Sequence, residues 1–320
     1  MKKGLVISFV TIGSILLIAG GVLLGFGIKE TVNNNKEIIK TYTFEENYES
    51  FNFILSTTNI TFKVSEDDTQ KVVVYEHEKN YHEVGLMKTE GKENYLLIHE
   101  VDNRDWYEKW FYTPSLKVEI YIPLGEYKDL NSSNATGNMD IPNGFIFDKV
   151  NITNKTGNLK FASEVNNETS IVTSTGSITL DGARTNTLVL NSSTGSINVK
   201  ETTVDEKLDA ISSTGSINVS TSTAKNASLE ASTGSVRLSN TMIEEHLSVK
   251  TSTGSISLTD SDAATLKLKA STGSIRGILL SPHIFYAMSK TGSVHVPTST
   301  EGGICEVETS TGSISFSIKE

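Results

Sequence analysis

The chain has 320 residues, of which 37% are hydrophobic and 21% are charged, a composition typical of folded proteins. Its formal net charge of -10 argues against a nucleic-acid partner, because phosphate binding requires clustered lysine and arginine residues. Only Lys2 and Lys3 form such a cluster. The single cysteine, Cys305, excludes an intrachain disulfide and a cysteine-based metal site.

An uncharged segment of twenty-five residues, Gly4 to Ile28, follows the short basic start of the chain. At about 1.5 Å per residue, a helix of this length crosses a hydrocarbon layer of roughly 30 Å, so we predict a single-pass transmembrane helix over 4–28. The lysines before it favour a cytoplasmic tail at 1–3, with the body of the protein outside the cell membrane. Residues 29–36 are typical of a polar stalk. A cleaved secretory signal is the alternative interpretation of the apolar segment.

Residues 37–130 alternate apolar and polar side chains with the period of half-buried strands. Leu116, Val118, Ile120 and Ile122 form one such run. We therefore predict an irregular all-β lead-in, which also caps the repeats that follow it.

The lead-in contains the strongest candidate contact surface of the chain, a cluster of five aromatic residues. Aromatic rings give a large contact area at a small entropic cost, which favours a binding platform for a sugar ring or a protein partner. Two other interpretations stay open: the segment folds over the first repeat as a cap, or it lies at the membrane interface. The candidate contact residues are Trp106, Tyr107, Trp110, Phe111 and Tyr112.

Three histidines of the lead-in stand near glutamates, a composition that suggests a metal site. His77 and His82 are five positions apart, so they face opposite sides of one strand, and the spacing matches no zinc pattern. We therefore interpret these two residues, together with His99, as parts of a solvated polar strand face.

The phrase Thr-Gly followed by Ser or Asn recurs ten times in residues 131–320, at intervals of 19 or 20 residues. This period indicates stacked structural units, because so short a repeat buries no core by itself. Glycine suits a tight corner because it reaches positive φ without strain. The corner glycines are Gly137, Gly157, Gly176, Gly195, Gly215, Gly234, Gly254, Gly273, Gly292 and Gly312.

Aligning the repeats at the glycine separates apolar from polar positions, as a strand requires. The positions two and four after the glycine, and five and seven before it, are mostly apolar and are predicted to face inward. The position three after it, such as Lys160 or Arg237, is polar and faces solvent. Cys305 holds an inward position seven before Gly312, which predicts a buried and inert thiol. The threonine before each glycine shares the inward parity, so we expect its hydroxyl to bond the corner backbone.

Each unit then consists of a strand, a Thr-Gly corner, a second strand and a return loop. We predict that residues 131–320 form a parallel β-solenoid of ten rungs, with strands of successive rungs about 4.8 Å apart. The last rung ends at residues 317–320 without a visible cap. An open strand edge either carries protective charge, which Lys319 and Glu320 would provide here, or accepts another strand. A homo-oligomer through this C-terminal edge is the second of these two expectations.

Six copies of the full phrase Ser-Thr-Gly-Ser-Ile, among them Ser174–Ile178 and Ser310–Ile314, follow the apolar segment and the lead-in. In this combination, residues 40–320 resemble the bacterial family of putative adhesins with β-strand repeats, whose members include the LiaG-like envelope proteins. The resemblance implies a β-solenoid in the cell envelope, a link to envelope stress, and no catalytic residues to carry over.

The sequence contains no paired catalytic set and no cofactor or metal motif. We therefore predict a non-enzymatic, membrane-anchored surface scaffold or adhesin-like binding module, with an envelope polymer or a membrane protein as its partner. Two alternatives stay open. One is a polysaccharide-processing enzyme, because stacked β-coils also host lyases and hydrolases. The other is an accessory that senses the envelope through a membrane partner.

Overall fold

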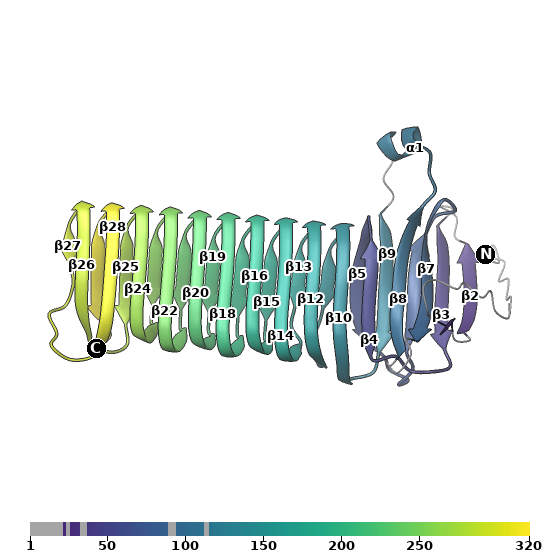
Figure 1. Ribbon diagram of the computed structural model, residues 1–320, viewed down its shortest axis with the longest axis horizontal. Coiled ribbons are helices and arrows are strands. Elements are labelled where there is room, and N and C mark those ends of the chain that lie inside the picture. The colour runs from purple at the N-terminus through teal and green to yellow at the C-terminus, as the bar shows by residue number, and fades with distance from the viewer. Residues whose placement is uncertain (1–21, 24–25, 33–36, 89–93, 112–114) are drawn as a thin grey trace, which may run out of the picture. The chain divides into compact units, whose positions relative to one another are not determined.

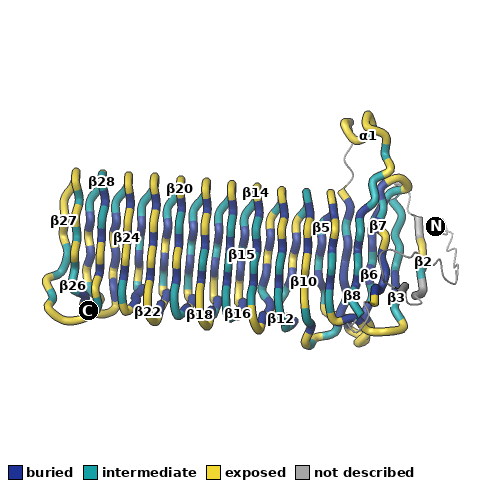
Figure 2. Tube along the Cα trace, viewed as in Figure 1, coloured by how far each residue is buried: buried dark blue, intermediate teal, exposed yellow. Residues whose placement is uncertain are grey.

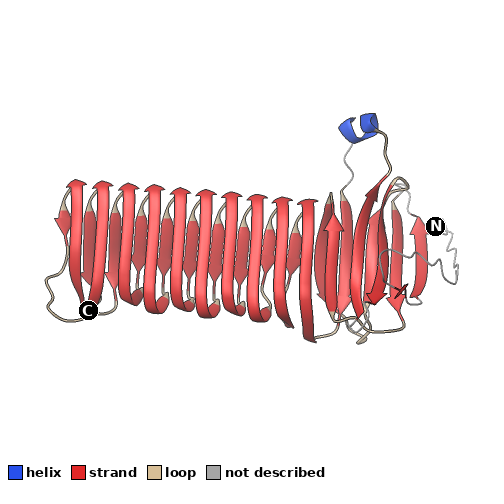
Figure 3. Ribbon diagram, viewed as in Figure 1, coloured by secondary structure: helices blue, strands red, loops and turns tan. Residues whose placement is uncertain are grey.

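The computed structural model describes all of the chain except residues 1–21, 24–25, 33–36, 89–93 and 112–114. Almost all of the described chain is β-strand, which confirms the predicted all-β class (Figure 3). Contacts between residues divide the chain into two compact units, Met1–Gly157 and Asn158–Glu320, which we call unit 1 and unit 2.

The predicted transmembrane helix, residues 4–28, falls mostly outside the described residues. Its described part is strand: Val22–Leu23 forms β1, and Phe26 begins β2 (Phe26–Val32), which pairs antiparallel with β3 (Ile38–Phe44). Strand β2 also contains the first residues of the predicted polar stalk. No described helix is long and apolar enough to cross a membrane.

Unit 1 contains two sheets, with strand orders β1-β7-β8-β4-β10-β12 and β2-β3-β6-β9-β5-β11. Parallel pairing begins before the first Thr-Gly corner, because β4 pairs in parallel with β10, and β5 with β11. On the other side of β8 and β9 the pairing becomes antiparallel, through β7 and β6. The remaining bounds are β4 (Ser50–Leu55), β5 (Thr58–Val64), β6 (Lys71–Glu76), β7 (Asn80–Lys88), β8 (Asn94–Asp102), α1 (Trp106–Phe111), β9 (Leu116–Ile122), β10 (Gly125–Thr136), β11 (Met139–Ile141) and β12 (Phe145–Thr156).

Aromatic side chains fill the space between the sheets of unit 1. Phe51 makes ring contacts with Phe53, Phe62 and Phe147 at centroid distances of 6.1, 5.4 and 6.0 Å, and all four rings are buried. Edge-to-face contacts at such distances add to the free energy gained by burying the rings. The phenylalanines at inward strand positions therefore build a core, whereas the tryptophans of α1 do not.

Unit 2 is a two-sided parallel β-solenoid, and the predicted fold is confirmed. One sheet holds the long strands in the order β14-β16-β18-β20-β22-β24-β28-β26, and the other holds the short strands in the order β13-β15-β17-β19-β21-β23-β25-β29-β27 (Figure 1). The bounds are β13 (Leu159–Phe161), β14 (Glu164–Thr175), β15 (Ile178–Asp181), β16 (Arg184–Thr194), β17 (Ile197–Lys200), β18 (Thr203–Thr214), β19 (Ile217–Ser220), β20 (Thr223–Thr233), β21 (Val236–Ser239), β22 (Met242–Thr253), β23 (Ile256–Thr259), β24 (Asp262–Thr272), β25 (Ile275–Leu279), β26 (His283–Thr291), β27 (Val294–His295), β28 (Gly303–Thr311) and β29 (Ile314–Ile318).

The predicted inward columns are buried in both units, and buried and exposed positions alternate along the strands (Figure 2). In register, Leu188 of β16 lies beside Leu208 of β18, and Leu190 lies beside Ala210. The rung around Gly292 is the exception, because its inward positions Phe285, Ala287 and Val294 are not fully buried.

The glycines at the Thr-Gly corners of unit 2 have φ between 141° and 149°, a region that side chains with a Cβ rarely occupy. They also stack on one another. A Cβ built on Gly195 would lie 2.0 Å from the carbonyl oxygen of Gly176, the corner glycine of the preceding rung. Glycine is thus required by the backbone angle and by the close approach of successive corners.

The prediction that the threonine before each glycine faces inward is wrong. Thr194 and Thr214 are exposed, and the residue two positions earlier is buried instead. Ser212 donates a hydrogen bond of 3.1 Å from its hydroxyl to the carbonyl oxygen of Gly195, and Thr251 does the same to Gly234 at 3.0 Å. The alternation of inward and outward side chains continues up to the position three before the glycine and breaks at the threonine. The residue at that earlier position, such as Ser212 or Thr251, therefore bonds the corner backbone.

The rungs of unit 2 do not follow chain order at their end. Strand β28, which is last but one in the sequence, pairs in parallel with β24 on one side and with β26 on the other. The strands β26 and β27 are therefore outermost in unit 2, rather than the last rung of the sequence as expected. Strand β27 pairs with β29 only at Ile314 and Ser315, so the rest of β29 has a strand partner on the β25 side alone among the described residues. Beyond β29, Lys319 forms an ion pair of 3.0 Å with Asp260.

Candidate functional site

The aromatic segment leaves the strands of unit 1 between β8 and β9 and forms the short helix α1, which projects from them (Figure 1). The interpretation of this segment as a cap over the first rung is wrong, because Trp106 and Trp110 are largely exposed. The antiparallel strands beyond β8 and β9 cover that side of unit 1 instead.

Helix α1 begins with a local signal that the sequence contains. The sequence Asp-x-x-Glu places Asp105 before the first turn and Glu108 three residues later. The Glu108 carboxylate accepts a hydrogen bond of 2.9 Å from the Asp105 amide, as in a capping box. The Lys109 amide donates to the Asp105 carbonyl at 3.1 Å, which closes the first helical turn.

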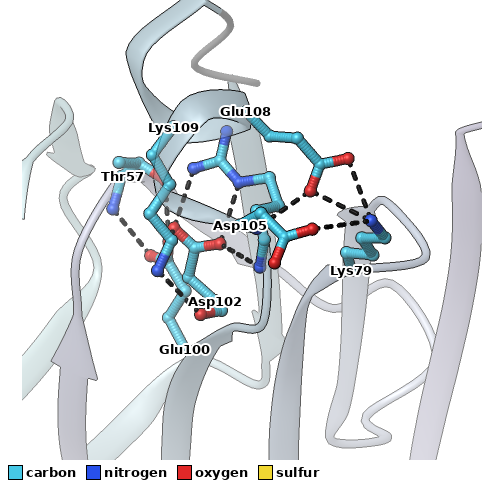
Figure 4. A network of polar contacts seen from close by, with 8 residues as sticks. Thr57, Lys79, Glu100, Asp102, Asp105, Glu108 and Lys109 are labelled. Carbon is cyan, nitrogen blue, oxygen red and sulfur yellow. Dashed lines mark hydrogen bonds and ion pairs between the residues drawn. The ribbon is translucent and has the colours of Figure 1, made fainter.

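A clamp at the end of β8 fixes the segment that leads into α1 (Figure 4). The Arg104 guanidinium donates two hydrogen bonds of 2.8 Å to the two carboxylate oxygens of Asp102. Hydrogen bonds from Arg104, opposed by burial, lower the pKa of Asp102. Lys109, on the helix, donates to the Asp102 carbonyl at 3.1 Å. This bidentate geometry restricts the orientation of the loop more than a single ion pair would.

A second link joins α1 to the turn between β6 and β7. Lys79 Nζ lies 2.9 and 3.0 Å from the two oxygens of Glu108, and 3.9 Å from Asp105 (Figure 4). The three carboxylates around the helix therefore face three basic side chains: Asp102, Asp105 and Glu108 against Lys79, Arg104 and Lys109. The helix presents no excess of either charge.

The two tryptophans share one side of α1, because they are four residues apart. Trp106 is 75% exposed and Trp110 is 79% exposed. Tyr107 is 49% exposed; its ring lies 6.1 Å from that of Trp106, and its hydroxyl donates to Asp105 at 3.1 Å. The side chain of Phe111 and all of Tyr112 lie outside what the structure describes. We call Trp106, Tyr107 and Trp110 the aromatic face.

The histidines do not form one polar strand face, and that interpretation is wrong for His82, which is buried. Its amide donates to Glu76 at 2.8 Å, and its Nε2 lies 2.8 Å from the hydroxyl oxygen of Thr58. Glu76 also forms an ion pair with Lys40, at 2.5 Å. Burial opposes ionisation of Glu76, but the bonds from His82 and Lys40 lower its pKa.

The buried chain of polar groups ends at Glu100, which sequence reasoning missed. One of its carboxylate oxygens accepts hydrogen bonds from the amides of Ser56 and Thr57 and from the hydroxyl of Thr58, at 2.7 to 2.8 Å. These bonds outweigh burial and lower the pKa of Glu100. Because the Thr58 hydroxyl donates to Glu100 and is fully buried, it is not an accessible nucleophile.

Two further observations bear on chemistry in the described part of the chain. No three side chains of His, Cys, Asp and Glu gather closely enough there to hold a metal ion. Cys305 is fully buried in unit 2, and burial together with the charge of Asp262 raises the pKa of its thiol to about 12. A thiol in this state is a packing group rather than a nucleophile.

The sequence profile of one protein family, described as Toastrack DUF4097, matches residues 49–241 and 205–320. The chain belongs to the Toastrack DUF4097 family. This membership confirms the resemblance found in the repeats and agrees with the two-sided stack of unit 2. No curated protein matches this Toastrack chain.

Several solved structures are similar to the Toastrack chain, each over 89% of its length. A putative lipid binding protein from Parabacteroides distasonis is 15% identical and covered over 98% of its chain, with a TM-score of 0.47. A putative adhesin from Bacteroides fragilis is 14% identical and 98% covered, with a TM-score of 0.35. A putative cell adhesion protein from Clostridium sporogenes is 10% identical and 100% covered, with a TM-score of 0.24.

Proposed function

We propose that this Toastrack protein is a non-enzymatic, adhesin-like surface module that binds a glycan of the cell envelope through its aromatic face. The observation that carries the proposal is the exposure of Trp106 and Trp110, at 75% and 79%, on one side of a helix that two ion-paired links hold in place. Leaving two tryptophans in water is unfavourable, and such residues usually mark an interaction site.

The chemistry around the tryptophans favours a sugar over a charged polymer. Flat indole faces stack on sugar rings, and the Asp105 and Glu108 carboxylates beside them accept hydrogen bonds from hydroxyl groups. The balance of three acids and three bases leaves no net charge to attract an anionic surface. An uncharged saccharide face therefore fits the site best.

The anchoring of the module is a separate part of the proposal. The apolar segment 4–28, preceded by Lys2 and Lys3, supports a membrane anchor with the solenoid outside the cell. A glycan ligand then lies within reach of the aromatic face in the same compartment. The link to envelope stress is supported only by the family resemblance, and no residue of the aromatic face is assigned to it.

The two tryptophans are the only ones in the chain, so intrinsic tryptophan fluorescence reports on this site alone. We expect soluble peptidoglycan glycan fragments to shift the emission of the full chain to shorter wavelength, saturably, because stacking removes water from the indoles. Trp110→Ala keeps Trp106 as the reporter and is expected to weaken binding about tenfold or more. Ile211→Ala, an exposed residue of unit 2, is the control and leaves binding unchanged.

Two outcomes contradict the proposal. If phosphatidylcholine vesicles shift the emission and the glycan fragments do not, the aromatic face binds a membrane interface instead. If the full chain releases new reducing ends from the polymer, and loses this ability with a carboxylate substitution, the protein is an enzyme. A saturable shift without turnover, reduced in Trp110→Ala, supports the binding module.

A further inference from the structure

The outer end of unit 2 leaves two strands open. β26 is the last strand of one sheet and pairs only with β28. β27 is the last strand of the other sheet and pairs only with β29. Among the residues that the structure describes, nothing pairs with the other side of either strand. The backbone groups along that side of β26 are therefore available to another strand.

The side chains at this end are more exposed than their counterparts in the stack. Tyr286 is 63% exposed and Met288 is 55% exposed, both on the outer face of β26. They form the outer rim of a groove of about 630 Å³ that runs across β24, β28 and β26. Phe285 and Ala287, on the inner face, are only half-buried, whereas the equivalent Leu266 and Leu268 are buried.

Strand β26 lacks the features that usually protect a sheet edge. It contains no proline and no acidic residue, and Lys290 is its one lysine or arginine. Natural edges usually carry several charges, a proline or a bulge. The nearest carboxylates, Glu306 and Glu308 of the neighbouring strand β28, are paired with Lys267 and Lys269 at 3.5 and 2.9 Å. Their charge is thereby balanced, which lets two chains of net charge -10 approach each other at this end.

We propose that this end is a self-association surface, on which the β26 strands of two copies pair antiparallel about a two-fold axis at Ala287. In this register, Tyr286 of each copy lies opposite Met288 of the other, which gives two apolar pairs of ring and thioether. Lys290 lies opposite Ile284 rather than opposite a second lysine. The half-buried Phe285 then lies opposite Ser289 of the second copy, on the inner face.

The strand is thus complementary to its own antiparallel copy in both polarity and charge. Pairing also covers Tyr286 and Met288 on the open side of the groove. An extended peptide of another protein could pair with β26 as well, but its sequence would have no reason to respect this register. The inference concerns unit 2 alone and is independent of the ligand of the aromatic face.

The register can be tested with charge pairs in the full chain, by sedimentation velocity in mild detergent over a range of concentrations. Tyr286→Lys combined with Met288→Lys places like charges opposite each other, and we expect the dissociation constant to rise roughly tenfold or more. Tyr286→Lys combined with Met288→Glu places opposite charges together, and is expected to restore dimerisation to within about threefold. Both positions are exposed, so both variants fold.

The control is Ile211→Lys, an exposed residue on the outer face of β18, which leaves the dimer unchanged. The proposal is overturned if the full chain is monomeric at every concentration. It is also overturned if a dimer forms but the lysine pair does not weaken it, or if the lysine-glutamate pair does not rescue it. In the last two cases the two copies meet elsewhere or in another register.

Discussion

At the scale of single residues, the corner glycine of the repeat meets two separate structural requirements. Each corner of unit 2 from Gly195 onward combines a positive φ with direct stacking on the corner glycine of an adjacent rung. The two requirements have different causes, since the first concerns the backbone of one residue and the second the distance between rungs. Only the first follows from the sequence pattern.

Gly215→Ala tests both requirements at once. The φ of Gly215 is 148°, and a Cβ would lie 2.2 Å from the Gly195 carbonyl oxygen. We expect the free energy of unfolding to fall by about 3 kcal/mol or more, from backbone strain and a clash that only backbone movement relieves. Urea denaturation of the full chain measures this. Ser213→Ala, an exposed neighbour, is the control, and an equal loss there would contradict the explanation.

At the scale of strands, the outward columns hold ion pairs that the alternation of side chains does not reveal. Glu119 of β9 lies 2.7 Å from Lys63 of β5 and 2.7 Å from Lys117 of its own strand. The Tyr121 hydroxyl donates to the same carboxylate at 2.9 Å. Burial opposes the ionisation of Glu119, but the hydrogen bonds from Lys117, Lys63 and Tyr121 lower its pKa to about 2.

This cluster gives unit 1 a defined acid sensitivity. Because the pKa of Glu119 is lower in the folded chain than in the unfolded chain, its stabilisation is complete above about pH 4.5. It is lost as the pH falls towards about 2. Glu119→Gln is expected to lower stability at pH 7 and to reduce the further loss between pH 5 and pH 3, measured as urea midpoints. An unchanged pH profile in Glu119→Gln, matching that of the exposed Glu126→Gln, would count against this role.

At the scale of the whole molecule, the order of the rungs departs from the order of the chain. Strand β28 enters between β24 and β26, so that Cys305 lies in register with Leu266 on one side and Phe285 on the other. The outermost rung of unit 2, made of β26 and β27, thus precedes β28 and β29 in the sequence. A residue near the C-terminus is fully buried as a result.

Cys305 reports on this order because it is the only thiol of the chain. We expect a thiol reagent to modify the native full chain very slowly at pH 7, since the thiol is buried and its pKa is raised to about 12. In urea the same thiol reacts fast. Phe285→Ala removes the cover from the β26 side and is expected to speed the native reaction, whereas Ile211→Ala is not. Equal native rates in the two variants would place β28 at the open end.

The repeat itself predicts most of this architecture. The glycine period gives the stack, and the columns around it give the buried and exposed faces, because side chains alternate strictly along a strand. The burial of Cys305 follows from its column. The aromatic cluster, as a candidate site, was also visible in the sequence. Its helix was not predicted, although the Asp-x-x-Glu signal that begins it stands at residues 105–108.

Other features depend on contacts between residues far apart in the chain, which a local pattern does not encode. The helix that carries Trp106 and Trp110 is linked through Glu108 to Lys79, which comes from a distant turn. His82 is buried where it meets Glu76 and Thr58. The position of β28 between β24 and β26 also depends on distant contacts. Because every rung presents nearly the same strand edge, only tertiary packing selects which strands pair with it. The sequence by itself determined the repeating unit and its two faces. The tertiary structure decided which rung ends the stack and which aromatic residues remain in water, because both depend on which segments meet in space.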